Sequence, residues 1–598
     1  MMINVKKLSY GKYLGRFLPK YFSTNRGKIV AYKIINTDKI RIINKKTYIE
    51  IIGQDTSHIN IALGLLIKNG IKSMEVDVPD FDFRGVMLDV SRSAVLKIDF
   101  LKEILVKLSL FGLNNLGLYM EDIFLIEGEP LIGFARGAYS KEEIRELEDF
   151  ANELGINIFP CFQTLGHLEQ ILKYVKYIKY RDTKRVINVT KSESYEFLEK
   201  IILGVASYFK NQYIHIGMDE PWLLGRGIAF KYNTPINPPE MYIEHLKKIT
   251  SIIKKSGKIP IIWGDFILDH KDLDIINEVP SEYIIDYWDY ESTETSYYQS
   301  KINILKEKKF DIIISPGAHN WNRFFGNTQR AYETNLPFIE AAKKENIKKG
   351  MLTLWGNDGN ESFVESSLPI IELFLKNTLS KKLETEIDYD FIKKIFNISK
   401  EEFDLYNRIE NPEISKTISG FIPDAKMLLY DDPLLAMISR HIKDLSVTQY
   451  YGNIAKHLSQ LKYSQNSLSK LAYYYSDLIS YKFYIIHTVL ECYLNKDKSG
   501  LIEIYKQILV LERKINKFYR EFKRNWDRRR KPFGFEVFTN RIGTIMLRTK
   551  QLKERLKDYI DGKIDIIDEF ELKDIPDLDK SDFTYYQQIY SKLFLIFL

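Results

Sequence analysis

Two adjacent carboxylates follow a strand-like run in the first half of the chain. Residues 213–218 are rich in β-branched and aromatic side chains, and Asp219 and Glu220 come directly after them. Neighbouring carboxyl groups can hold one proton and one negative charge at neutral pH, which is the arrangement that cleavage of a glycosidic bond requires. Hydrolysis of such a bond is therefore the first hypothesis.

The local pattern decides whether these two carboxylates can share one site. Alternation along a strand places His215 and Asp219 on the same face. Glu220 reaches that face only if the chain turns after Asp219, and Pro221 favours a turn because it disfavours helical backbone at the preceding residue. His215 is as compatible with a hydrogen-bonded core residue as with proton transfer.

Short β-branched runs alternate with helical segments from about residue 83 to residue 377. Eight such runs occur, and they begin at residues 84, 115, 156, 213, 259, 283, 311 and 351. Eight strand-then-helix units predict an α/β fold with a central (β/α)8 TIM barrel, whose strands are apolar because both faces are buried. A doubly wound open sheet is the structural alternative.

Polar and aromatic side chains gather at the predicted C-terminal ends of these strands, where a barrel places its active site. Four of the six tryptophans lie there, which favours a sugar platform over simple capping of the core. The side chains in question are Gln163, His167, Trp263, Asp265, Tyr287, Trp288, His319, Asn320, Trp321, Trp355 and Asp358.

The segments on either side of the barrel differ from it. Residues 1–79 are predicted to form a small N-terminal α/β domain with a helix at residues 57–68, and residues 80–383 the catalytic barrel. Residues 384–598 carry long amphipathic patterns, such as the apolar stripe in residues 508–522, and are predicted to form a C-terminal all-α domain. The basic run at residues 528–531 is interpreted as a solvated helix end.

Composition argues against several classes of function. A net charge of +7 over 598 residues is too dilute to indicate a nucleic-acid partner. Cys161 and Cys492 are the only cysteines, which argues against a disulfide framework and suits a reducing compartment. No apolar run approaches ~20 residues and no secretory signal is visible, so we expect a cytoplasmic protein without a membrane partner. No His-x-His opens the first strand, so we expect neither a metal nor another cofactor.

Three motifs lie on or directly after predicted strands of the barrel. They are residues 83–92 (Phe-Arg-Gly-Val-Met-Leu-Asp-Val-Ser-Arg), residues 215–220 (His-Ile-Gly-Met-Asp-Glu) and the pair Trp355-Gly356. Together they resemble glycoside hydrolase family 20, the β-N-acetylhexosaminidases. Residues 160–167 and 531–534 are similar to the branch with an all-helical C-terminal domain, so the resemblance spans nearly the whole chain and implies the three domains above.

The resemblance implies a mechanism in which the 2-acetamido oxygen of the substrate attacks the anomeric carbon. Glu220 would protonate the leaving oxygen and then activate water, while Asp219 would hold the acetamido nitrogen and stabilise the oxazolinium cation. Further roles implied by the resemblance concern sugar binding. Arg84 would bind sugar hydroxyls, His167 would be an active-site histidine, and an acetamido pocket would be lined by Trp263, Trp288 and Trp355, with Trp321 next.

The chain departs from the family pattern at two places. The usual tyrosine after the seventh strand, which bonds the acetamido oxygen, is absent from residues 318–320, so Tyr287 or Asn320 would replace it. The acidic residue expected after Trp355-Gly356 is Asn357, with Asp358 one place later. Contacts to the 4- and 6-hydroxyls, and with them the gluco or galacto preference, stay open.

These observations predict an exo-acting, retaining β-N-acetylhexosaminidase. Its substrate would be an oligosaccharide or glycoconjugate with a terminal N-acetylglucosamine, with N-acetylgalactosamine open as a second sugar. An exo-β-glucosaminidase is one alternative and would need a second carboxylate about 5 Å from Glu220. A glycan-binding protein without catalysis is the other, and the presence of both carboxylates disfavours it. The resemblance also implies a homodimer.

Overall fold

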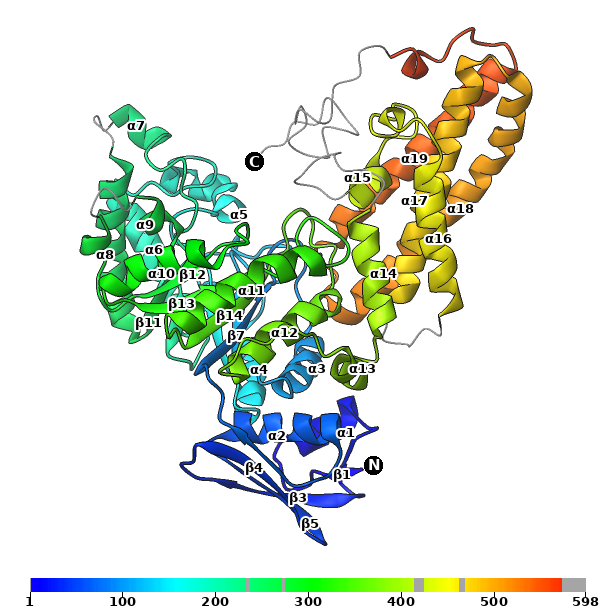
Figure 1. Cartoon of the computed structure of the whole chain (residues 1–598). Helices are drawn as coiled ribbons and strands as arrows, with labels where there is room; N and C mark the ends of the chain where they lie inside the picture. Colours follow the sequence, from blue (N-terminus) through cyan, green and yellow to red (C-terminus); the bar gives the residue numbers. More distant parts are fainter. Residues whose placement is uncertain (1, 233–236, 271–274, 413–423, 462–467, 573–598) are drawn as a thin grey trace.

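The computed structural model describes residues 2–232, 237–270, 275–412, 424–461 and 468–572. Three parts follow one another along the chain: a small sheet with two helices, a closed barrel, and a group of long helices (Figure 1). This architecture confirms the predicted fold class and excludes the open-sheet alternative.

The N-terminal part is a six-stranded sheet in the order β2-β1-β3-β5-β4-β6. Its helices, α1 (Gly11–Phe17) and α2 (Thr56–Asn69), cover the face turned toward the barrel (Figure 1). Helix α2 begins after Asp55, whose side chain accepts a hydrogen bond from the backbone N–H of His58 at 3.1 Å. The strands are β1 (Ile3–Asn4), β2 (Phe22–Ser23), β3 (Lys28–Ile34), β4 (Lys39–Asn44), β5 (Tyr48–Gly53) and β6 (Met74–Asp77).

The barrel is closed by eight parallel strands in chain order, with β14 paired to β7. The strands are β7 (Phe83–Asp89), β8 (Asn115–Tyr119), β9 (Asn157–Cys161), β10 (Tyr213–His215), β11 (Ile259–Trp263), β12 (Ile284–Trp288), β13 (Asp311–Ser315) and β14 (Lys349–Leu354). All eight predicted runs are strands, but β10 ends three residues early because Gly217 and Met218 have positive φ angles of 71° and 76°.

Helices surround the barrel and bury one apolar face each against it. They are α3 (Ile98–Ser109), α4 (Lys141–Glu153), α6 (Ser192–Ala206), α8 (Pro238–Ser256), α10 (Thr295–Glu307), α11 (Thr328–Lys344) and α12 (Leu368–Leu379). Three short helices, α5 (Glu169–Leu172), α7 (Ile228–Tyr232) and α9 (Asp265–Asp269), belong to loops after strands. Helices α5 and α7 mark the end of the barrel that lies away from the N-terminal sheet (Figure 1).

The C-terminal part of the described chain is helical. Its helices are α13 (Tyr389–Phe396), α14 (Lys400–Glu410), α15 (Asp424–Tyr430), α16 (Ser446–Gln460), α17 (Ser469–Leu494), α18 (Lys498–Arg529) and α19 (Phe535–Ile560). The predicted apolar stripe lies on α18, and Ile508, Leu511, Ile515, Phe518 and Phe522 are buried within the chain. The stripe is therefore internal core and supplies no surface for a dimer, and the oligomeric state stays a prediction.

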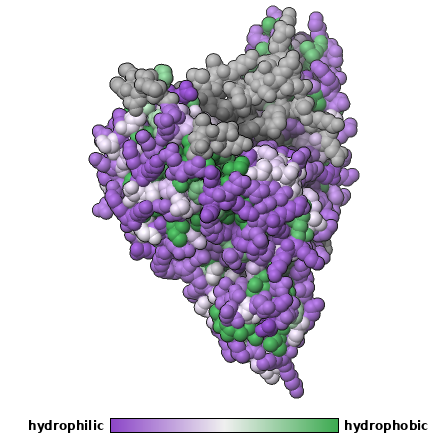
Figure 2. Space-filling view, turned by 60° about the vertical axis from the view of Figure 1, so that its left-hand side comes forward, coloured by the Kyte–Doolittle hydropathy of each residue, from purple (hydrophilic) through white to green (hydrophobic). Residues whose placement is uncertain are grey.

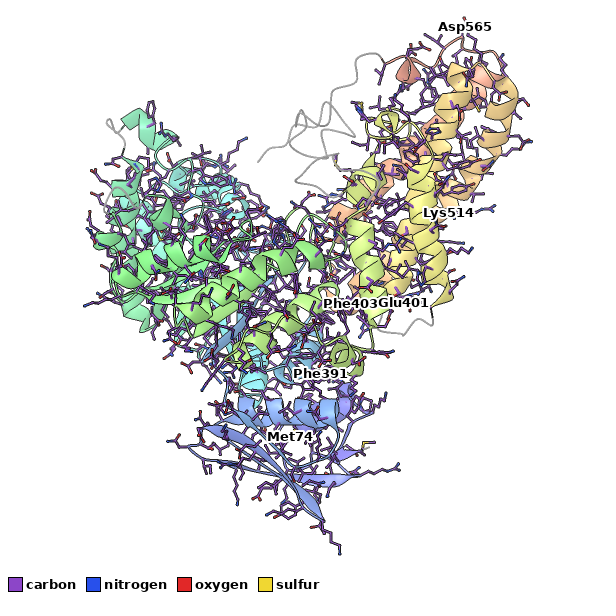
Figure 3. The ribbon with its side chains drawn as sticks, viewed as in Figure 1. Met74, Phe391, Glu401, Phe403, Lys514 and Asp565 are labelled. Atoms are coloured by element: carbon purple, nitrogen blue, oxygen red, sulfur yellow. The ribbon has the colours of Figure 1, made fainter. Side chains whose placement is uncertain are left out.

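The three parts meet near α13. Phe391 of α13 packs against Phe111, with 4.4 Å between ring centroids, and lies beside Gly64 of α2 (Figure 3). A Cβ atom at Gly64 would come within 2.2 Å of the backbone oxygen of Leu110, so glycine is required for α2 to approach the barrel this closely. This contact ties the N-terminal helix, the barrel and the start of the helical part into one core.

The basic run at residues 528–531 docks the helical part onto the barrel. Arg529 is 1% exposed and its Nε lies 2.8 Å from Glu365 Oε1, while Arg528 pairs with Glu103 and Lys531 with Glu143. The interpretation of this run as a solvated helix end is therefore wrong. Isolated charge runs are usually solvated, and only the tertiary contact supplied these partners.

Most of the surface on the face shown in Figure 2 is hydrophilic, and hydrophobic side chains gather at its lower end, where the N-terminal part lies. Exposed hydrophobic residues of that part include Tyr32, Ile34 and Ile35. Among the described residues, no helix has the length and apolar character needed to cross a bilayer.

Candidate active site

Asp219 and Glu220 converge on one point at the C-terminal end of the barrel. His167 Nε2 lies 3.3 Å from Asp219 Oδ2 and 3.3 Å from Glu220 Oε2. The Asp219 side chain is 9% exposed, whereas the Glu220 side chain is 27% exposed. The chain does turn after the strand, and Glu220 itself has a φ of 44°. Two carboxylates of unequal burial thus share a single site, as the sequence predicted.

Gln163 orients the Asp219 carboxylate. Its Nε2 donates to Asp219 Oδ1 at 2.8 Å and to the hydroxyl of Tyr119 at 3.0 Å, and its Oε1 accepts from the backbone N–H of Met218. A Cβ atom at Gly217 would lie 2.0 Å from Gln163 Oε1, so this glycine leaves room for the amide as well as taking a positive φ. The glycine of the motif therefore serves the position of Asp219.

The carboxylates and His167 set one another's charge. Burial favours a neutral Asp219, but the charge and hydrogen bond of His167 and the bond from Gln163 outweigh it and lower the pKa of Asp219. Burial likewise lowers the pKa of His167, but the bonds to Asp219 and Glu220 together with the Asp219 charge raise it to about 10. Arg185 Nη2 lies 3.0 Å from His167 Nδ1. This contact opposes protonation of His167 at Nδ1, because a guanidinium only donates and Nδ1 must then accept. In either state Nε2 carries a proton toward the two carboxylates.

Asp265 is a third carboxylate at this site. Its Oδ2 accepts from the backbone N–H of Glu220 at 3.0 Å, and its Oδ1 accepts from Trp288 Nε1 at 3.3 Å. Burial, together with the charges of Asp219 and Glu220, raises the pKa of Asp265 to about 7. Asp265 therefore fixes the strained backbone of Glu220 and one wall of the pocket at the same time.

Four aromatic side chains form a group beside the carboxylates. Tyr290 lies 5.1 Å from Trp288 and 5.2 Å from Trp321 between ring centroids, and its hydroxyl accepts from Trp355 Nε1 at 2.7 Å. Asn320 Nδ2 donates to the Trp355 carbonyl at 2.9 Å. The structure thus brings Trp288, Asn320, Trp321 and Trp355 together, and adds Tyr290, which the sequence analysis missed.

Two aromatic candidates lie outside this group. Trp263 is 0% exposed and sits beneath Trp355, 4.3 Å from the ring of His215, so it forms the floor under the site and lines no accessible pocket. Tyr287 packs 4.8 Å from Phe338 of α11, outside the barrel. Its assignment to the sugar site is wrong, because side chains alternate along β12 and those of Asp286 and Trp288 point inward.

The two arginines around β7 have opposite surroundings. Arg84 donates to the carbonyls of Gly112 and Phe81 and to the Ser57 hydroxyl, each at 2.8 Å, at the end of the strand beside the N-terminal part. The prediction that Arg84 binds sugar is therefore wrong. Arg92 follows the C-terminal end of β7, where its Nη1 contacts Asp89 Oδ2 at 3.0 Å and Asn357 Oδ1 at 3.1 Å.

Arg92 also connects to the carboxylate site. Its guanidinium lies 5.0 Å from the ring of Tyr119 and 5.2 Å from that of Trp355, and its Nε lies 3.4 Å from Glu121 Oε1. Burial raises the pKa of Glu121 to about 7, and the charge of Arg92 opposes that rise. Arg92 stands in the same motif as Arg84. The signal in the sequence was that Arg92 follows the C-terminal end of the predicted strand, whereas Arg84 lies at its start.

Asp358 points away from the sugar site. Its Oδ2 lies 2.7 Å from Lys426 Nζ and its Oδ1 lies 2.9 Å from Arg541 Nη2, so it pairs with two cations of the helical part. The prediction that it binds substrate is wrong, because cations of the helical part engage both of its carboxylate oxygens. Asn357, which is exposed, faces Arg92 instead.

His215 lies inside the barrel below the carboxylates. Its Nδ1 accepts from the backbone N–H of Gly217 at 3.1 Å, and its Nε2 lies 3.4 Å from Asp286 Oδ2. Both side chains are fully buried, and burial raises the pKa of Asp286. His215 supports the turn that carries Asp219. Across the described ranges, no group of three or more His, Cys, Asp or Glu side chains is arranged to hold a metal ion.

Comparisons with known proteins bear on two stretches of the chain. The model for the glycosyl hydrolase family 20 catalytic domain matches residues 127–346, and the model for the glycoside hydrolase 20C C-terminal domain matches residues 403–588. Human hexosaminidase D is 29% identical over 198 residues, which are 32% of this chain and 40% of that protein. The chain therefore spans less than half the length of this relative.

Two solved structures share the fold. A Vibrio harveyi exo β-N-acetylglucosaminidase in complex with N-acetylglucosamine is 18% identical with a TM-score of 0.50, covering 66% of this chain and 72% of that one. A Flavobacterium johnsoniae chitobiase is 16% identical with a TM-score of 0.52, covering 88% of this chain and 95% of that one. At these identities the likeness concerns the fold alone.

Proposed function

Because the chain belongs to glycoside hydrolase family 20, we propose that it is an exo-acting, retaining β-N-acetylhexosaminidase that removes terminal, non-reducing N-acetylglucosamine. The observation that carries this proposal is the shared contact of His167 Nε2 with Asp219 and Glu220. It joins a buried, charged carboxylate to a more exposed one at the mouth of a barrel.

Each carboxylate suits one step of a substrate-assisted reaction. The acetamido oxygen of the substrate attacks the anomeric carbon and the bond from that carbon to the leaving oxygen breaks. Glu220 transfers its own proton to the leaving oxygen. Asp219 accepts a hydrogen bond from the acetamido nitrogen and stabilises the positive charge of the oxazolinium. Water then attacks the same carbon while Glu220 takes its proton. Two inversions give net retention.

The engagement of Asp219 favours this route over a covalent enzyme intermediate. Gln163 donates to its Oδ1 and His167 Nε2 lies at its Oδ2, so neither oxygen is left without a donor. Such a carboxylate is held as a charged acceptor, and it is a poor nucleophile for a free glucosaminide. This observation ranks the exo-β-glucosaminidase alternative below the proposed function.

Tyr290 suits the role of the missing family tyrosine. Trp355 Nε1–H can only donate, so the Tyr290 hydroxyl accepts that bond and keeps its own proton. That proton can be donated to the acetamido oxygen, which aligns it for attack. On the other side of Trp355, Arg92 and Asn357 present a donor and an amide to the sugar hydroxyls.

A panel of three p-nitrophenyl glycosides tests the proposal. We expect turnover of the N-acetylglucosaminide, weaker or equal turnover of the N-acetylgalactosaminide, and none of the free glucosaminide, which lacks the acetamido oxygen. A thiazoline mimic of the oxazolinium should bind at least 10²-fold more tightly than N-acetylglucosamine. Turnover of the free glucosaminide would favour the exo-β-glucosaminidase, and binding without any turnover would favour a glycan-binding protein.

A further inference from the structure

The loop after β14 is held by four side chains of the helical part. Lys426 of α15 lies 2.7 Å from Asp358 Oδ2 and 2.5 Å from Glu361 Oε2. Arg541 of α19 contacts the same two carboxylates at 2.9 and 2.7 Å. Tyr430 donates to Glu361 at 2.8 Å, and Arg530 donates to the carbonyl of Asn360 at 2.5 Å. Two cations of the helical part thus match two carboxylates of this loop.

The backbone of the loop also approaches the helical part closely. Arg541 Nη1 donates to the carbonyl of Asp358 at 2.9 Å, and Lys426 Nζ donates to the same oxygen at 3.0 Å. Gly359 has a φ of 98°, and a Cβ atom there would lie 2.4 Å from Arg541 Nη1. The contact is therefore built into the loop conformation, because this φ favours glycine and a Cβ atom would displace the guanidinium.

The other side of the same loop borders the sugar site. The backbone N–H of Gly356 donates to Asp89 Oδ2 at 2.9 Å, and Asn360 Nδ2 donates to the Asp89 carbonyl at 3.3 Å. Asn357 accepts from Arg92 at 3.1 Å. Every loop residue from 356 to 361 except Gly359 thus has a hydrogen bond or ion pair to one of the two sides, and Gly359 packs against Arg541.

A continuous set of contacts leads from the loop to the catalytic carboxylate. Arg92 lies over the ring of Tyr119, and the Tyr119 hydroxyl accepts from Gln163 Nε2 at 3.0 Å. The same Nε2 donates to Asp219 Oδ1 at 2.8 Å. The site residues closest to the helical part are Arg92 and Asn357, which we propose bind the sugar hydroxyls. Asp219 is separated from the helical part by several side chains.

We propose that the helical part acts as a positioning element for the sugar site, with Arg541 and Lys426 as positioning residues that act through Asp358 and Glu361. They hold the loop so that Asn357 meets Arg92 and Trp355 keeps its place against Tyr290. This inference rests on the proposed function. It also predicts where the effect is felt: the loop contacts the hydroxyl side of the sugar, so its release weakens ground-state binding more than the chemical step.

Arg541→Met tests the proposal, with Arg555→Met as its matched control. Both arginines lie on α19, and Arg555 also pairs with two carboxylates, Asp568 at 2.9 Å and Glu569 at 3.1 Å, but about 21 Å farther along the helix. For Arg541→Met we expect the KM for p-nitrophenyl N-acetylglucosaminide to rise at least tenfold while kcat stays within threefold. Arg541→Lys should recover part of that loss. Arg555→Met should leave both constants unchanged.

A merely structural role predicts a different result. Loss of folded enzyme lowers the apparent kcat and leaves KM unchanged. An unchanged KM for Arg541→Met therefore overturns the inference, whether or not the apparent kcat falls. If Arg541→Met fails to fold, Asp358→Asn removes the same charge pair from the loop side and is read by the same KM criterion. A wild-type chain that turns over no N-acetylhexosaminide would contradict the proposed function, whereas an active wild type with an unaffected variant contradicts this inference alone.

Discussion

The two ends of strand β7 carry one arginine each, and the two side chains differ in almost every respect. Arg84 meets two carbonyls and a hydroxyl, and burial lowers its pKa to about 10. Burial also disfavours the charge of Arg92, but Tyr119, Asp89 and Glu121 outweigh it and raise its pKa. One end of the barrel thus joins two parts of the fold, and the other gathers charge around a site.

The largest effect is expected from removing Glu220, the proposed proton donor at the site end. Glu220→Gln should lower kcat for a natural disaccharide by about 10²- to 10⁴-fold, because general acid catalysis contributes that much. The unfolding midpoint should change little, since the side chain is partly exposed. Turnover of chitobiose measures the change in kcat, and thermal unfolding of the same sample measures the change in the unfolding midpoint. A near-wild-type rate on the disaccharide would contradict the assignment of Glu220 as the general acid.

The two arginines themselves give the sharpest contrast. Arg92→Met should lower kcat/KM by about 10- to 100-fold, the worth of a charge-assisted hydrogen bond or two, with little loss of stability. Arg84→Met should lower the free energy of unfolding by about 2–4 kcal/mol, because it leaves three buried acceptors or donors unpaired, while the folded fraction keeps its kcat/KM. Chemical denaturation and active-site titration separate these outcomes, and a reversed pattern would refute the division between the two ends.

Two tyrosines near β12 repeat the comparison on a smaller scale. Tyr290→Phe removes the hydroxyl that we propose donates to the acetamido oxygen, and it should lower kcat/KM about tenfold. The Tyr287 hydroxyl is buried without a hydrogen-bond partner in the described part of the chain. Tyr287→Phe should therefore leave the kinetics unchanged and alter stability by no more than about 1 kcal/mol, in the stabilising direction. Equal kinetic effects of both changes would contradict the placement of Tyr290.

Asp265 gives a pH-dependent test of crowding among the carboxylates. Its pKa is about 7, so the folded state keeps a proton that the unfolded state releases, and the stability of the wild type falls as the pH rises from about 4 to about 7. The rise from 3.8 to about 7 corresponds to about 4 kcal/mol at full burial. Asp265 is half-buried, and screening by solvent reduces this to roughly 2 kcal/mol. Asp265→Asn should therefore gain roughly 2 kcal/mol relative to the wild type between pH 5 and pH 8.

Urea unfolding of wild type and Asp265→Asn at both pH values measures that difference. A difference between the two proteins that stays constant with pH would show that Asp265 is not protonated in the folded state at pH 5. This effect concerns stability and leaves turnover aside, because Asp265 positions the backbone of Glu220.

Local patterns in the sequence determined the barrel and the place of its carboxylate pair. Buried parallel strands are continuous apolar runs, so all eight could be counted, and Pro221 marked a turn after Asp219. These features depend on neighbouring residues and on backbone geometry alone. For the same reason, His167 and the tryptophans at strand ends could be assigned to the correct end of the barrel.

Only the tertiary structure decided which way individual side chains point and what they meet. Tyr287 or Tyr290, Arg84 or Arg92, and Asp358 or Asn357 are close in sequence, but a one-residue change along a strand reverses the face, and a positive φ in a loop redirects a side chain. The partners of Asp358 and of the basic run lie on elements tens to hundreds of residues away. Contacts of that kind arise from packing between parts of the chain, which no local pattern encodes.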